Sequence, residues 1–133
     1  NIPPSSNGGG TGTANPPIST LPPTSSTFFV QTKTGGTIEL KNFYPQAVKT
    51  LPGYVVIKET PYYRLIFYEA DTSFVISIIN ANVPTARAVA ELEVPDTLGI
   101  SQQEACQLRI SIGVSLHVSE TYGGKSYGLG FCQ

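Results

Sequence analysis

The chain has 133 residues, a formal net charge of −1 and a charged fraction of only 13 %. Its eight basic and nine acidic residues form no basic cluster, so nucleic acid is not an expected partner, because such binding needs several Lys or Arg side chains on one face. No run approaches the roughly 18 apolar residues of a membrane span, and we expect none in this chain. The chain starts at Asn1 and lacks methionine, which predicts a processed or trimmed N-terminus.

Residues 1–26 differ in composition from the rest of the chain. They contain three Pro-Pro pairs, a Gly8–Gly10 run and no charge, and the first charged residue is Lys33. Such a segment has little to bury and favours extended geometry. We therefore predict two parts, an extended Pro/Gly/Ser/Thr-rich arm over residues 1–26 and a globular domain over residues 27–133.

The first half of the domain reads as a series of strands. Two β-prone runs at 28–33 and 37–41 flank Gly35-Gly36 and predict a hairpin. Three further strands are expected at 54–60, 62–70 and 74–79. These last three runs are apolar at nearly every position, which predicts that both of their faces are covered.

One helical pattern follows the strands. Residues 83–94 are rich in helix formers and place apolar side chains on one stripe, and Pro84 suits the first turn. Pro95 is expected to end or kink this helix. A Ser101…Glu104 capping-box pattern then predicts a second, very short helix that ends near Cys106.

The stretch Leu108–Val118 alternates apolar and polar residues over eleven positions, a period typical of a strand with one buried face. This strict alternation favours an edge position in the sheet, where free main-chain groups invite a neighbouring strand. We therefore treat the strand as a candidate docking site, with its apolar side contributed by Leu108, Ile110, Ile112, Val114 and Leu116.

Cys106 and Cys132 are the only cysteines. They fit one disulfide in an oxidising compartment, which would clamp the start of the last strand to the end of the chain, and the alternative is two unpaired structural cysteines. The predicted fold class is α+β: a mostly antiparallel sheet of about six strands with one main helix and one short helix packed on it, one disulfide, and the extended N-terminal arm.

Two segments carry a resemblance to known proteins. Leu98-Gly99-Ile100 runs into Ser101…Glu104-Ala105-Cys106, and the chain closes with Tyr127-Gly128-Leu129-Gly130-Phe131-Cys132. With the alternating strand between them, these segments make residues 28–132 resemble uncharacterised cell-surface proteins of uncultivated small-genome bacteria, in which a membrane anchor and a Pro/Ser/Thr-rich linker precede the domain. The resemblance implies a cell-surface location and a Cys106–Cys132 pair, and it implies no activity.

No residue constellation predicts catalysis or a cofactor. His117 is the only histidine and is best interpreted as an exposed strand residue; with two cysteines it supplies no zinc ligand set, and no calcium-binding loop pattern is present. Gly124-Lys125-Ser126 lacks the upstream glycine of a phosphate loop and is interpreted as a loop. We expect a protein that is not an enzyme.

Two functions remain as hypotheses. The first is a structural subunit of an extracellular filament or surface assembly, in which the arm adds a strand to a neighbouring copy. The second is a monomeric cell-surface binding module on a proline-rich stalk, with exposed tyrosines for a glycan or another surface ligand. Both place the protein outside the cell. The residues assigned to the assembly arm are Ile18, Leu21, Phe28, Phe29 and Val30.

Overall fold

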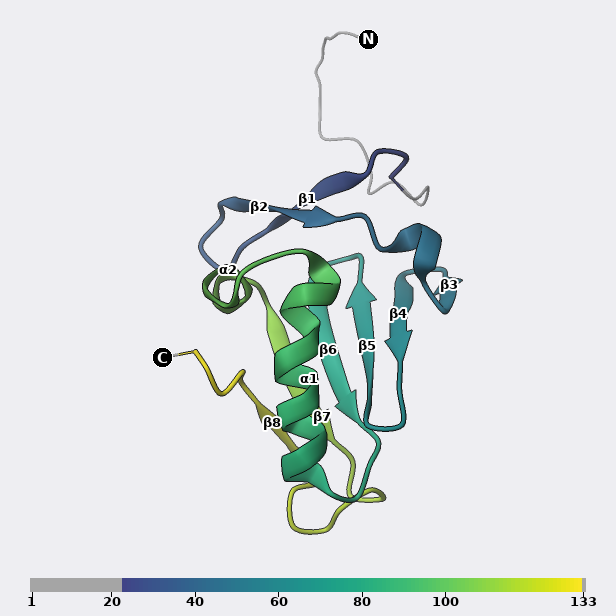
Figure 1. The fold of residues 1–133 in the computed structure, drawn as a ribbon, viewed down its shortest axis with the longest axis vertical. Coiled ribbons are helices and arrows are strands. Elements are labelled where there is room, and N and C mark those ends of the chain that lie inside the picture. The colour runs from purple at the N-terminus through teal and green to yellow at the C-terminus, as the bar shows by residue number, and fades with distance from the viewer. Residues whose placement is uncertain (1–22, 133) are drawn as a thin grey trace, which may run out of the picture.

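The computed structural model describes residues 23–132 and has an α+β fold in which α1 (Val83–Leu98) lies across one face of a six-stranded sheet (Figure 1). A separate hairpin crosses one end of the sheet and the helix. The predicted α+β class, with one main helix, one short helix and one disulfide, is confirmed. The remaining elements are β1 (Thr27–Gln31), β2 (Thr37–Lys41), a 3₁₀ turn (Tyr44–Gln46), β3 (Lys49–Leu51), β4 (Tyr54–Glu59), β5 (Tyr63–Tyr68), β6 (Ser73–Ile78), α2 (Gln102–Gln107), β7 (Ile110–Val114) and β8 (Lys125–Tyr127).

The sheet has the strand order β3-β4-β5-β6-β7-β8. All of its pairings are antiparallel except that of β6 with β7, which is parallel. Parallel neighbours need a long crossover connection, and here α1 and α2 together provide it. The crossover places α1 over one face of the sheet, on the side where the core lies.

The residues just before β1 are hydrogen-bonded to Asn42, the residue that follows β2. The Asn42 side-chain amide donates to the carbonyls of Pro23 and Ser25 at 2.9 and 2.8 Å. The backbone amide of Asn42 donates to the Ser26 carbonyl at 2.9 Å. Among the residues assigned to the assembly arm, Phe28 and Val30 pack into their own domain, whereas Phe29 is 65 % exposed. Ile18 and Leu21 lie outside the described residues.

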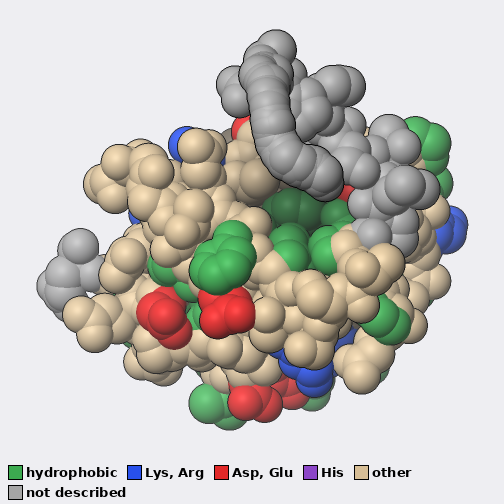
Figure 2. Space-filling model, turned by 90° about the horizontal axis from the view of Figure 1, so that it is seen from above, with side chains coloured by type: hydrophobic (Ala, Val, Ile, Leu, Met, Phe, Trp, Pro, Cys, Tyr) green, Lys and Arg blue, Asp and Glu red, His purple; other side chains and the backbone are tan. Residues whose placement is uncertain are grey.

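Charge is sparse on this end of the molecule. Seen from above, most of the surface is neither charged nor apolar, and one group of apolar side chains lies near its centre (Figure 2). This distribution agrees with the low charged fraction of the chain.

The core lies between α1, the sheet and the hairpin. Aromatic rings fill the end nearest the hairpin, where Phe43 lies 5.2 Å from Phe28 and 5.3 Å from Phe67 between ring centroids, and Phe67 lies 4.9 Å from Phe74. Aliphatic side chains fill the remainder. The largest fully buried side chains are those of Tyr63, Phe74, Leu40, Leu65, Ile76, Ile78, Leu98, Leu108, Ile112, Val55 and Val94.

Helix α1 is longer than predicted, because it continues past Pro95 and extends to Leu98. A proline removes one backbone donor and is most costly in the middle of a helix, and here it lies in the last turn with its ring buried. The end comes at Gly99, which adopts φ +70°. Its amide donates to Asp96 and the Ile100 amide donates to Pro95, which is the hydrogen-bonding pattern of a Schellman motif.

The short helix α2 begins as predicted. The Glu104 amide donates to the Ser101 hydroxyl, and the Ser101 amide donates to the Glu104 carboxylate, both at 3.0 Å. This reciprocal capping box is complete.

The strand predicted at Leu108–Val118 is shorter and differently placed. β7 spans Ile110–Val114 and pairs with β6 on one side and β8 on the other, so the edge position is wrong. Leu108 caps α2, and Leu116, which is 64 % exposed, lies in a turn after the strand. The chain reverses there because the Gly124 amide donates to the Val114 carbonyl at 2.8 Å and brings β8 back against β7. The main chain of this proposed docking strand is therefore used within the domain.

Candidate binding surface

The sheet has one open face, although the sequence predicted that both faces of β4, β5 and β6 are covered. Buried and partly exposed residues alternate along these strands. In β5, for example, Leu65 and Phe67 are buried, whereas Ile66 and Tyr68 are not. The prediction is wrong because apolar side chains also line the face that no described element covers.

Cross-strand pairing orders this open face into three rows. Residues directly opposite each other on neighbouring strands share a face. An aromatic row is followed by an aliphatic row and then by a polar row. The rows are Leu51, Tyr54, Tyr68 and Ser73; Lys49, Val56, Ile66, Val75 and Ser111; and Glu59, Arg64, Ser77, Gly113 and Ser126.

A cleft of about 500 Å³ lies over the β3–β5 part of the open face. Tyr54 and Tyr68 line it as a cross-strand pair, with ring centroids 6.0 Å apart and ring planes at 32°. Arg64 donates to Glu59 at 2.5 Å within the same cleft. The cleft thus combines two aromatic rings with an ion pair of which both members are partly exposed.

A register irregularity in β4 places Lys58 and Glu59 on opposite faces of the sheet. The register shifts between Val56 and Lys58, so that Lys58 lies opposite Leu65, a residue of the face covered by α1. Such bulges redirect side chains. The Lys58 ammonium consequently lies 3.3 Å from Glu93 on α1, while Glu59 remains with the cleft.

Glu93 also accepts a hydrogen bond from the Tyr63 hydroxyl at 2.7 Å. This hydrogen bond, and to a lesser extent Lys58, lowers the pKa of Glu93 below its usual value. Burial and the same hydrogen bond raise the pKa of Tyr63. The buried phenol is thereby tied to the surface of the helix.

Replacing Tyr63 by phenylalanine is expected to destabilise the domain by about 1 kcal/mol at pH 7, since Glu93 is partly exposed. The pKa of Glu93 is lower in the folded state than in the unfolded state, so its contribution is present above the unfolded pKa of about 4.3 and is lost as the pH falls through the folded pKa. The difference between wild type and Y63F in urea unfolding should therefore shrink in acid. Tyr62→Phe, the same change at the preceding residue, should show no such pH dependence.

A second hollow lies on the covered side of the sheet, between α1 and β8. This pocket of about 300 Å³ reaches from the first half of α1 to the buried side of β7. It is lined by Val83, Pro84, Arg87, Ala88, Glu91, Ile112, Val114, Tyr122 and Tyr127.

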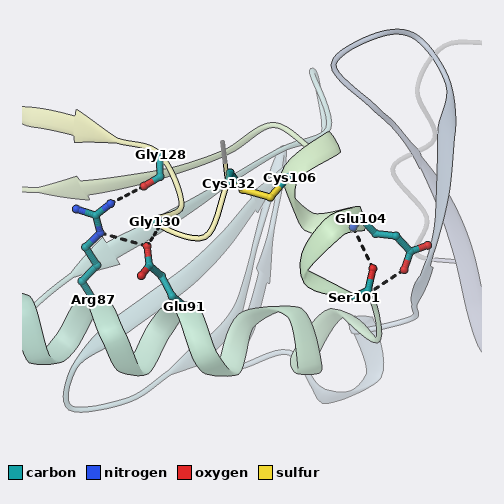
Figure 3. The surroundings of a disulfide bond; sticks show 8 residues. All are labelled: Arg87, Glu91, Ser101, Glu104, Cys106, Gly128, Gly130 and Cys132. Atoms are coloured by element: carbon teal, nitrogen blue, oxygen red, sulfur yellow. Dashed lines mark hydrogen bonds and ion pairs between the residues drawn. A yellow bond between two sulfur atoms is a disulfide. The ribbon is translucent and has the colours of Figure 1, made fainter.

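The C-terminal segment is held at two places. Arg87 donates to the Gly128 carbonyl at 2.7 Å, and the Gly130 amide donates to Glu91, the ion-pair partner of Arg87 (Figure 3). Beyond them, Cys132 is bonded to Cys106, with Cα atoms 5.5 Å apart, as expected for a disulfide. The predicted pair is confirmed. The α1 contacts were not predicted, because Arg87 and Gly128 are 41 positions apart.

The residues considered as candidates for catalysis, metal binding or phosphate binding do not form a common site. His117 is exposed in the turn after β7 and not in a strand. Lys125 and Ser126, predicted as loop residues, belong to β8. Within residues 23–132, no group of three or more His, Cys, Asp or Glu side chains is arranged to hold a metal ion.

No protein-family model, curated protein or solved structure matches this chain. In the described part of the chain, no helix has both the length and the apolar character needed to cross a membrane. A functional assignment therefore depends on the surfaces of the domain.

Proposed function

We propose that this protein is an extracellular binding module, carried on a Pro/Ser/Thr-rich stalk, that binds carbohydrate in the cleft of the open sheet face. The observation that supports this proposal most directly is the Tyr54–Tyr68 pair beside the Glu59–Arg64 ion pair. The disulfide supports an extracellular location, because such bonds persist in oxidising compartments.

The chemistry of the cleft suits a sugar. Tyrosine presents an apolar ring face with a polar edge, and a pyranose presents an apolar C–H face with hydroxyls at its rim. The guanidinium of Arg64 and the ammonium of Lys49 are donors, and the Glu59 carboxylate is an acceptor. Together they match the donor and acceptor character of sugar hydroxyls around the two rings.

A glycan array probed with the purified chain, followed by calorimetry on the sugars that bind, tests the proposal. Tyr68→Ala is expected to weaken binding at least tenfold, because it removes one of the two rings, which is 40 % exposed in the structure. Phe29→Ala, which removes an exposed ring from the hairpin, should leave binding unchanged. Absence of any bound sugar, or equal affinities for wild type and Y68A, would contradict the proposal.

Assembly through the N-terminal arm is the second candidate. The sheet edges β3 and β8 have only three residues each, which makes them poor templates for strand addition. Strand β1 is longer, has five residues, pairs only with β2 among the described residues, and carries the exposed Phe29. An oligomer seen in sizing of the full chain, and lost on deletion of residues 1–22, would favour assembly over the stalked module.

A further inference from the structure

The pocket between α1 and β8 has the features of a small-molecule site distinct from the open face. Its volume of about 300 Å³ is at the lower end of the range for ligand pockets. Ile112 and Val114, both buried on β7, form its inner side, and Val83, Pro84 and Ala88 of α1 form another wall. A mostly apolar lining with a few polar groups is typical of such sites.

The wall formed by β8 and the loop between β7 and β8 is held in place before any ligand binds. The Tyr127 hydroxyl donates to the Tyr122 carbonyl at 2.8 Å, and the Arg87 guanidinium lies 5.3 Å from the centroid of the Tyr127 ring. Gly123 is buried, and a Cβ atom there would lie 2.2 Å from the Ser119 carbonyl oxygen and 2.6 Å from the Leu116 Cα. Only glycine allows this close packing of the loop, which preserves the pocket.

The polar groups that line the pocket are only partly used. Arg87 employs its Nε and one Nη atom, toward Glu91 and Gly128. Glu91 accepts through Oε2 alone. Among contacts between described residues, the other Nη of Arg87 and Oε1 of Glu91 have no hydrogen-bond partner. One donor group and one acceptor group are therefore available beside an apolar pocket.

We propose that this pocket binds a small neutral molecule with an apolar body and an amide group. The apolar body lies against Ile112 and Val114, the amide carbonyl accepts from Arg87, and the amide N–H donates to Glu91. A neutral amide suits the pair better than a charged group, because Arg87 and Glu91 already neutralise each other at 3.2 Å.

N-acetyl-L-phenylalaninamide is the probe, added to the full chain while methyl signals are followed by NMR. Saturable shifts are expected at Ile112 and Val114, with toluene, which has a similar ring without the amide, binding at least tenfold more weakly. Ala88→Phe places a large side chain at the pocket from an exposed position of α1 and should weaken probe binding at least tenfold. Thr85→Phe, also exposed on α1 but outside the pocket lining, is the matched control and should bind normally.

Several results would overturn the proposal. They are the absence of saturable shifts at Ile112 and Val114, equal probe affinity in A88F and wild type, and shifts confined to Ile66 and Val75 on the open face. Equal affinities for toluene and the amide would refute the roles of Arg87 and Glu91. The result is independent of the carbohydrate proposal, which concerns the opposite face of the sheet.

Discussion

Replacing Phe74 by alanine is expected to lower the free energy of unfolding by about 4 kcal/mol, the largest loss from any single substitution considered. Phe74 is fully buried, lies opposite Phe67 on β5, and its ring also lies 6.2 Å from that of Phe43. Removal of the ring leaves a cavity where the sheet meets the segment after the hairpin, so the hairpin should lose support as well. Urea unfolding followed by circular dichroism measures the change.

Val75→Ala is the matched control for this variant, because Val75 is the next residue of β6 but points to the open face. Its loss should be about 1 kcal/mol, since a smaller and half-exposed side chain is removed. Similar losses for the two variants would show that the two faces of the sheet contribute equally, contrary to the burial pattern.

Removal of the disulfide by Cys106→Ser together with Cys132→Ser is expected to cost about 3.5 kcal/mol. The two cysteines are 26 positions apart, and opening a loop of this length adds that much conformational freedom to the unfolded chain in the chain-entropy treatment. For a domain of this size, the melting temperature should fall by roughly 10 °C. Thermal unfolding of the variant and of the wild type with and without reductant measures the effect.

The hydrogen bonds from α1 to Gly128 and Gly130 lead to a further prediction for the double serine variant. Hydrogen exchange should increase mainly near Cys132 and in α2, while Gly130 remains protected because its amide still donates to Glu91. In the double serine variant with Glu91→Ala added, which removes the acceptor of the Gly130 amide, protection at Gly130 should fall. Equal loss of protection in both variants would contradict the role assigned to Glu91.

Local signals in the sequence explain the elements that were predicted. The capping box at Ser101 is satisfied within four residues, the hairpin β1–β2 requires only two β-prone runs and a Gly-Gly turn, and the stripe of α1 repeats within one helix. Short-range patterns of this kind depend little on the rest of the fold, which is why these elements could be predicted from residue order alone.

The wrong predictions have other causes. Leu116 continues the alternation of β7, yet the chain turns before it because Gly124 bonds back to Val114. Pro95 is tolerated in α1 because it lies in the final turn, whose position is set by Gly99. Ile66 and Val75 led to the prediction of a second covered face. Among the described residues, however, α1 packs on one face of the sheet, and Ile66 and Val75 lie on the other. The turn before Leu116 depends on a contact with Gly124, the end of α1 depends on Gly99, four residues after Pro95, and the open face depends on where α1 packs.

The same distinction applies to the candidate sites. The residue order by itself determined the α+β class and the presence of two cysteines able to pair, because composition and periodicity express these directly. Only the tertiary structure decided which strands lie inside the sheet, which face stays open, and that Tyr54 meets Tyr68 while Arg87 and Glu91 meet Gly128 and Gly130. These sites form where strands and segments far apart in the chain come together, and no local pattern encodes that pairing.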